Sequence, residues 1–117
     1  SLANLTTRKR ESEYFLNGAR IVAASTVFLV LIGALGVLDA ERNAPDANIT
    51  NFGDALWWSF VTITTVGFGE YYPVTLVGRT ISVIMMFVGI ALVGVITAGF
   101  ASWFLAKMEA ANTQNRT

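Results

Sequence analysis

Residues 62–69 combine residue types at a spacing that suits the binding of a partly dehydrated cation. Thr62, Thr65, Gly67 and Gly69 surround a single aromatic residue, and the stretch carries no charge. A cation that leaves water needs replacement oxygen ligands, and backbone carbonyls supply them without trapping the ion as full charges would. Glycines at alternate positions can adopt conformations that turn several successive carbonyls toward one axis. The Thr65 hydroxyl would add one more neutral oxygen.

The segment before this stretch determines whether it is a cation site or only a helix C-cap followed by a loop. Asn51 is an N-cap candidate with Asp54 in the first turn, which predicts a helix over about residues 51–64. Such a helix is roughly 20 Å long and crosses only about half a bilayer, so the chain must turn back through residues 65–69. This context favours the cation site.

Composition and hydropathy place these elements in a membrane. Hydrophobic residues make up 54% of the 117-residue chain and charged residues 14%. The uncharged runs 21–38 and 80–106 are long enough to cross a bilayer. We therefore predict an all-α membrane protein with an outer helix over about 18–40, a pore helix over about 51–64, a filter at 65–69 and an inner helix over about 76–107. Residues 1–17 form either an interfacial helix or a solvated tail, and residues 108–117 form a cytoplasmic tail.

The charges lie unevenly along the chain. Most basic residues lie outside the two spans, whereas the segment between them is acidic, with Asp39, Glu41, Asp46, Asp54 and Glu70. The positive-inside rule therefore predicts a multi-pass protein of the cell membrane with both termini in the cytoplasm. Irregular backbone at membrane depth must be sheltered by protein or water, which a single short chain cannot supply. Because the chain has no internal repeat, we expect a homo-oligomer with cyclic symmetry.

Several function classes are excluded by what the sequence lacks. Cysteine and histidine are absent, so no disulfide, thiolate metal site or histidine-based catalysis is available. Since no nucleophile with a base and no phosphate-binding loop is present either, the chain is not expected to be an enzyme. Membrane lipids are expected partners, and nucleic acid is not.

The stretch TITTVGFG at residues 62–69 resembles the signature of potassium channels. The flanking sequences AERNAPDANITNFGDALWWS, YPVTLVGR and GIALVGVITAGFASWF are similar to small proton-activated bacterial two-helix potassium channels and to the pore modules of actinobacterial six-helix voltage-gated ones. The resemblance covers about residues 18–106. It implies a fourfold-symmetric tetramer that conducts K+ passively. It also implies a filter over 65–69 with K+ held by the carbonyls of Thr65, Val66, Gly67 and Phe68, and with Gly69 at its outer end.

The resemblance also assigns supporting roles. Trp57 and Trp58 would brace the filter from behind, although tryptophans of an interfacial belt are the plainer alternative. Thr62 and Val61 would support the filter from the pore helix, and Glu70 would form an acidic ring at the outer mouth. Gly89 would be the gating hinge of the inner helix, with close helix packing as the alternative.

Three departures limit what the resemblance implies about gating. Phe68 replaces the common tyrosine, so its hydrogen bond to a bracing tryptophan cannot form. Val61 stands where the proton-activated channels have a buried glutamate. No histidine is present to sense protons.

Other functions remain open at this stage. A nonselective cation channel of the same architecture is one alternative, although such channels typically break the aromatic position between the glycines. A subunit of a potassium transporter is another, although those proteins resemble four linked repeats with one glycine in each strip. A purely structural two-helix membrane protein would have no use for the half-depth helix. The sequence leaves two readings of the chain open: a complete two-helix channel, or the excised pore of a longer channel with a voltage-sensor or cytoplasmic domain.

Overall fold

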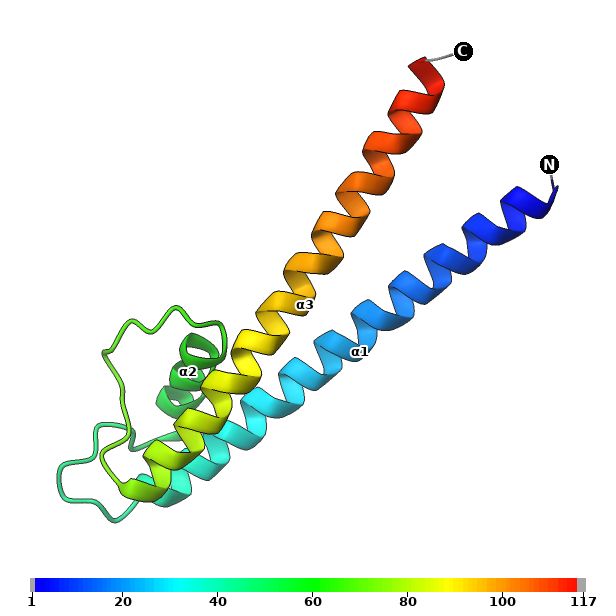
Figure 1. Ribbon diagram of the computed structural model, residues 1–117. Helices are drawn as coiled ribbons and strands as arrows, with labels where there is room; N and C mark the ends of the chain where they lie inside the picture. The colour runs from blue at the N-terminus through cyan, green and yellow to red at the C-terminus, as the bar shows by residue number, and fades with distance from the viewer. Residues whose placement is uncertain (1, 116–117) are drawn as a thin grey trace.

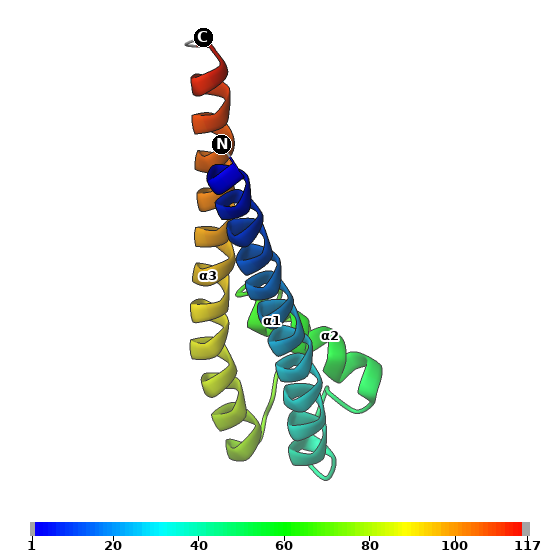
Figure 2. The same ribbon diagram turned by 90° about the vertical axis from the view of Figure 1, so that its right-hand side faces the viewer.

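The computed structural model describes residues 2–115 and contains three helices and no strand in that range. The helices are α1 (Leu2–Glu41), α2 (Phe52–Ile63) and α3 (Leu76–Asn115). The long helices α1 and α3 lie side by side at one end of the molecule and diverge toward the opposite end, where α1 begins and α3 ends (Figure 1). Figure 2 shows α2 beside the end where the long helices meet. The all-α fold with two long helices and one short helix is as the sequence predicted.

Both long helices have the length and composition of membrane spans. The candidate spans are Asn4–Glu41 and Leu76–Thr113. Only 22% and 17% of the most apolar stretch of each span is buried within the chain. The remaining apolar surface therefore needs lipid or further protein to cover it.

The two long helices extend further than the uncharged runs indicated. The sequence predicts the outer helix over about 18–40 and the inner helix over about 76–107. In the structure each helix has 40 residues, because α1 begins earlier, at Leu2, and α3 ends later, at Asn115. Residues 2–17 thus belong to α1 and are not a separate element, and no proline interrupts the helix there. At 1.5 Å per residue each helix is about 60 Å long, roughly twice the hydrocarbon thickness of a bilayer.

The short helix α2 begins and ends close to the predicted bounds. Asn51 is its N-cap, and its Oδ1 accepts a hydrogen bond from the backbone N–H of Asp54 at 2.8 Å. Its Nδ2 donates to the Asp54 carboxylate at 2.9 Å, so the two side chains fix the start of the helix. The helix has 12 residues, about 18 Å, which is too short to cross a bilayer.

The three helices meet in one small core. Val30 and Ala34 of α1, Trp58 and Ile63 of α2, and Met85 of α3 are all buried. The buried hydroxyl of Ser59 donates to the backbone carbonyl of Val30 at 2.8 Å and so ties α2 to α1. This junction sets the depth and direction at which α2 ends.

Candidate ion-conducting site

The strip between α2 and α3 follows the path predicted for a re-entrant segment. Residues 64–75 contain no regular secondary structure. They leave the C-terminal end of α2 and run back to the start of α3, at the end of the molecule where α1 stops (Figure 1). The chain therefore enters and leaves this region on the same side.

The backbone φ angle changes sign from residue to residue along positions 65–69. Thr65, Gly67 and Gly69 have positive φ angles of 65°, 58° and 82°, and Val66 and Phe68 between them do not. In an ordinary strand successive carbonyls point to opposite sides, whereas a left-handed turn at every second residue allows them to point to one side. The sequence predicted this freedom for the two glycines but not for Thr65. Left-handed backbone costs a non-glycine residue about 1–2 kcal/mol, and such outliers cluster at functional sites.

Backbone hydrogen bonds fix the start of the strip to the last turn of α2. The N–H of Thr65 donates to the carbonyl of Thr62, and the N–H of Gly67 donates to the carbonyl of Val61, both at 3.1 Å. The Thr64 hydroxyl donates to the Phe60 carbonyl at 2.7 Å. Val61 and Thr62 thus contact the strip through their backbone carbonyls. The replacement of glutamate by valine at position 61 gave no indication of this contact.

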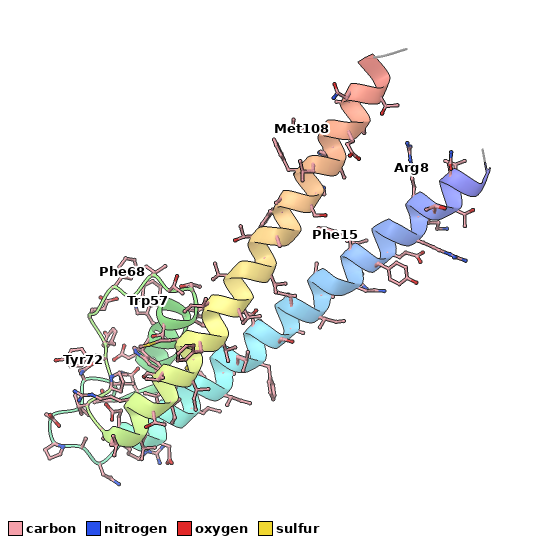
Figure 3. The ribbon with its side chains drawn as sticks, in the orientation of Figure 1. Arg8, Phe15, Trp57, Phe68, Tyr72 and Met108 are labelled. Carbon is pink, nitrogen blue, oxygen red and sulfur yellow. The ribbon has the colours of Figure 1, made fainter. Side chains whose placement is uncertain are left out.

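Trp57 supports the strip at two points. Its Nε1 donates a hydrogen bond to the Glu70 carboxylate, and its indole ring stacks on the Phe68 ring at 6.3 Å between centroids and 8° between planes. Figure 3 shows Trp57 and Phe68 on the same side of α2. The sequence predicted an acidic ring from Glu70, and the structure adds that one carboxylate oxygen is held by Trp57. Phe68, which has no hydroxyl to donate, is thus held by ring stacking.

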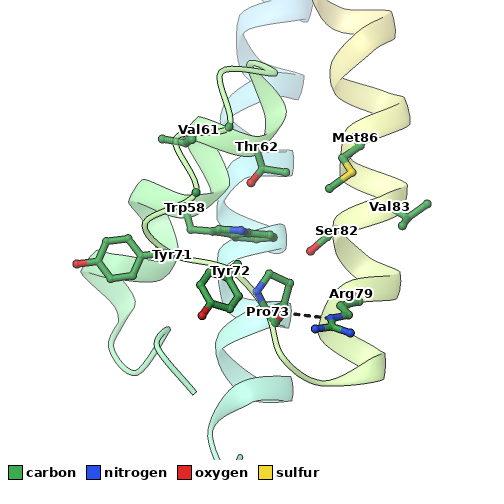
Figure 4. A pocket seen from close by; sticks show the side chains of 12 residues that line it. Trp58, Val61, Thr62, Tyr71, Tyr72, Pro73, Arg79, Ser82, Val83 and Met86 are labelled. Atoms are coloured by element: carbon green, nitrogen blue, oxygen red, sulfur yellow. Dashed lines mark hydrogen bonds between the residues drawn. The ribbon is translucent and has the colours of Figure 1, made fainter. Parts of the chain in front are cut away.

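Trp58 lies differently from its neighbour. It is buried in the core at 4% exposure and lines a cavity of about 490 Å³ between the strip and α3. Figure 4 shows its indole facing Ser82, with Pro73 and Arg79 below them in this view. The Nε of Arg79 donates to the Pro73 carbonyl at 3.3 Å. Trp58 is thus part of the core behind the strip, as a brace would require.

The outer end of the strip is held by two side chains, Glu41 and Asn48, for which the sequence predicted no contact with the strip. Glu41, the last residue of α1, is fully buried, and its carboxylate accepts hydrogen bonds from the backbone N–H groups of Val74 and Thr75, the latter at 2.9 Å. Asn48 accepts a hydrogen bond from the Tyr72 N–H at 2.7 Å. These pairs are 33, 34 and 24 residues apart, so no local sequence signal could identify them.

Negative charge gathers around the outer loop. The charge of Asp54 raises the pKa of Tyr71 above its usual value of 10.0, and a hydrogen bond to the same carboxylate, desolvation and the charge of Glu70 act in the same direction. Tyr71 is therefore protonated at neutral pH. The region beside the strip thus has an acidic character that favours cations over anions.

Gly89 of α3 lies directly against the end of α2. A Cβ at this position would lie 3.0 Å from the Ile63 carbonyl carbon and 3.1 Å from its Cα, and closer still to the carbonyl oxygen. Gly94 and Gly99, by contrast, have nothing within 4 Å of such a Cβ. Gly89 thus packs closely against the end of α2, and α3 is continuous through it, while the hinge at Gly89 stays a prediction.

Comparisons of sequence place the chain among known channels. A family model described as "ion channel" matches residues 21–106. The calcium-gated potassium channel TvoK of Thermoplasma volcanium is 35% identical over 84 residues, which are 71% of this chain and 24% of that protein. A voltage-gated potassium channel of Aeropyrum pernix is 34% identical over 89 residues, which are 73% of this chain and 30% of that protein. The chain thus spans about a quarter to a third of these relatives.

Solved structures give the same fold. A voltage-gated K+ channel pore module, crystallised in a closed state in lipid membranes, matches with a TM-score of 0.67 at 41% identity, over 79% of this chain and 96% of that chain. A voltage-gated K+ channel pore domain in a closed state matches with a TM-score of 0.64 at 40% identity, over 76% of this chain and 98% of that one.

Proposed function

We propose that this chain, which belongs to the ion channel family, forms one quarter of a potassium-selective pore that conducts K+ passively through a filter of backbone carbonyls. The observation that carries the proposal is the left-handed backbone at Thr65, Gly67 and Gly69, directly after a helix of half the bilayer depth. The carbonyls of residues 65–68 would hold the permeant K+ ions, and the Thr65 hydroxyl would complete the innermost site.

The assembly we propose is a homotetramer. Val66 and Phe68 of the strip are 57% and 66% exposed in the single chain, and a strip at membrane depth needs protein around it. Four copies around one axis would bring four strips together and cover part of the apolar faces of α1 and α3. The known pore modules that match this chain support this arrangement.

The direction of α2 supports cation binding. Its C-terminal end, at Ile63, leads directly into the strip. The free carbonyls at a helix C-terminus carry a partial negative charge of about half an electron, which would favour a cation below the filter. In a tetramer four such ends would point at one site.

The orientation we propose places both termini in the cytoplasm. Within the described residues, the helix segments outside the uncharged runs 21–38 and 80–106 carry Arg8, Lys9, Arg10, Arg20 and Lys107, and the loop end between α1 and α3 is acidic. This distribution follows the positive-inside rule. The relatives are much longer than this chain. We therefore propose that a voltage-sensor or cytoplasmic domain accompanies the pore in the full-length protein. Bending of α3 near Gly89 is the gate motion we propose, limited by its packing on Ile63.

The alternatives differ in selectivity and copy number. A nonselective cation channel would pass K+ and Na+ similarly, but the glycine–aromatic–glycine pattern at 67–69 is intact, and its aromatic ring is stacked on Trp57. A transporter built from four linked repeats would keep one glycine in each strip, whereas this strip has both Gly67 and Gly69.

The test is ion flux through the purified chain in liposomes. We expect K+ flux to exceed Na+ flux by a wide margin under matched gradients, with a particle of tetramer mass. In Gly67→Ala the added Cβ would meet no atom within 4 Å, but alanine disfavours the positive φ angle that this position requires. The K+ flux of this variant should therefore fall. Equal K+ and Na+ fluxes, or a particle smaller than a tetramer, would overturn the proposal.

A further inference from the structure

The cavity behind the strip is lined by an indole donor that has no acceptor in the described part of the chain. Trp58 is 4% exposed, and its ring lines this cavity of about 490 Å³. The two tryptophans of α2 differ here, because the Trp57 indole donates to the Glu70 carboxylate, whereas the Trp58 indole makes no hydrogen bond within residues 2–115. A buried indole N–H usually has a hydrogen-bond partner. The Trp58 N–H therefore calls for an acceptor inside the cavity.

Thr62 lines the same cavity, and its hydroxyl also has no partner among the described residues. Five other threonine hydroxyls in that range each donate to the backbone carbonyl four residues earlier, namely those of Thr26, Thr64, Thr80, Thr97 and Thr113. The Trp58 carbonyl lies at the same spacing from Thr62, yet the Thr62 hydroxyl makes no bond to it. Figure 4 shows this hydroxyl on the side of Thr62 that faces the Trp58 indole. Two unpartnered polar groups of α2 thus meet in one corner of the cavity.

Ser82 of α3 supplies a third polar group from the opposite wall. It is 3% exposed, and its hydroxyl donates to the Gly78 carbonyl at 2.9 Å. A hydroxyl that donates one hydrogen bond keeps its oxygen lone pairs for accepting others. Figure 4 shows the Trp58 indole facing Ser82 across the cavity. The corner is therefore bounded by one N–H donor and by two hydroxyl oxygens that can accept.

We propose that this corner binds one ordered water molecule, which accepts a hydrogen bond from Trp58 Nε1 and donates to the hydroxyl oxygens of Thr62 and Ser82. Buried water in proteins typically has about three polar partners, and these three groups supply that number. Water is the smallest molecule that can accept one of these bonds and donate the other two. The bound water would join α2 to α3 directly behind the strip, because Gly67 and Gly69 line the same cavity.

The direct test is a crystal structure of the purified protein at a resolution that shows ordered water. We expect a solvent peak about 2.7–3.2 Å from Trp58 Nε1 and within hydrogen-bond distance of the Thr62 and Ser82 hydroxyls. An acceptor of a neighbouring protomer bonded to Nε1 would overturn the proposal, and so would a lipid or detergent chain that fills the corner with no polar atom near the indole. The cavity is lined by residues of one chain, so this result does not depend on ion selectivity, which K+ and Na+ flux test separately.

Two variants of Thr62 separate the hydroxyl from the shape of the side chain. Thr62→Val has nearly the same shape but no hydroxyl, so the solvent peak should disappear and the unfolding temperature should fall. Thr62→Ser keeps the hydroxyl and should keep the peak. Thr80→Val is the matched control, because it removes an exposed hydroxyl that bonds within α3 and lies outside the cavity, and it should lower the unfolding temperature much less. An unchanged solvent peak in Thr62→Val would overturn the proposal.

A double variant tests whether the indole and the hydroxyl share one molecule. Trp58→Phe keeps an aromatic ring in the core but removes the N–H donor. If one water joins the two groups, either single variant already breaks the site, so Trp58→Phe with Thr62→Val should lower the unfolding temperature by clearly less than the sum of the two single shifts. Single shifts that add up in the double variant would show that the two groups share no bound molecule, and the proposal would fail.

Discussion

Replacing Gly89 with alanine tests how closely α3 packs against the entrance of the strip. The added Cβ would meet backbone atoms of Ile63 at 3.0 Å and 3.1 Å, and backbone cannot rotate away as a side chain can. Overpacking of this kind costs about 1–3 kcal/mol in each protomer. The change from glycine to alanine in a helix gains at most about 1 kcal/mol. We therefore expect a net loss of stability, together with a displaced strip, because the strip begins directly after Ile63.

The matched control is Gly94→Ala in the same helix. Nothing lies within 4 Å of a Cβ at Gly94, so this variant should gain the helix-propensity term without a clash. Both variants are compared with the unmodified protein by the temperature at which the tetramer dissociates, at fixed detergent and K+ concentration, and by K+ flux. If Gly89→Ala were as stable as Gly94→Ala and conducted normally, the close contact would be refuted and flexibility would be the only remaining reason for the glycine.

Four further outcomes follow from the site. Thr65→Ala should remove only the innermost K+ site and Thr65→Ser should keep it, as measured by ion occupancy in crystals; unchanged occupancy in the alanine variant would exclude the hydroxyl as a ligand. Trp57→Phe keeps an aromatic ring but loses the indole donor, so K+ currents should decay faster under sustained opening, and unaltered decay would show that the bond is dispensable. Glu41→Gln retains a single acceptor oxygen for the two backbone donors, so it should cost about 1–3 kcal/mol of stability, measured by tetramer dissociation. Unchanged stability would contradict the stabilising role of these two hydrogen bonds. Tyr71 should deprotonate above the usual pKa of 10.0 in an ultraviolet titration, and Asp54→Asn should lower its pKa; since the folded-state pKa is raised, its contribution to stability is complete below pH 10 and is lost as the pH rises through the folded-state pKa.

The sequence was most informative where the signals are local. The N-cap Asn51 and the acid at Asp54 located the start of α2 to within one residue, and the glycine spacing located the unusual backbone at 67 and 69. The ends of the long helices were not located, because an uncharged run reports the hydrocarbon thickness and not where helical hydrogen bonding stops. Polar residues 2–17 and 108–115 extend these helices on either side of the runs.

The supporting contacts were harder to predict because they join distant parts of the chain. The hydrogen bonds of Glu41 with the backbone just before α3 depend on where α1 ends, and the residues that donate them lie more than thirty positions away. The left-handed conformation of Thr65 carries no sequence signal, since threonine seldom adopts it. The stacking of Phe68 on Trp57 became visible only in the structure. The sequence indicated only that Phe68 lacks the hydroxyl for a hydrogen bond to a tryptophan.

The central claim is that the backbone carbonyls of residues 65–68 are the ion ligands, and ion density in the tetramer tests it most directly. Crystals grown with Tl+ in place of K+ should show a row of anomalous peaks on the symmetry axis, at the level of Thr65, Val66, Gly67 and Phe68. Peaks found only beside the Glu70 carboxylates, or no peaks along the strip, would contradict the account.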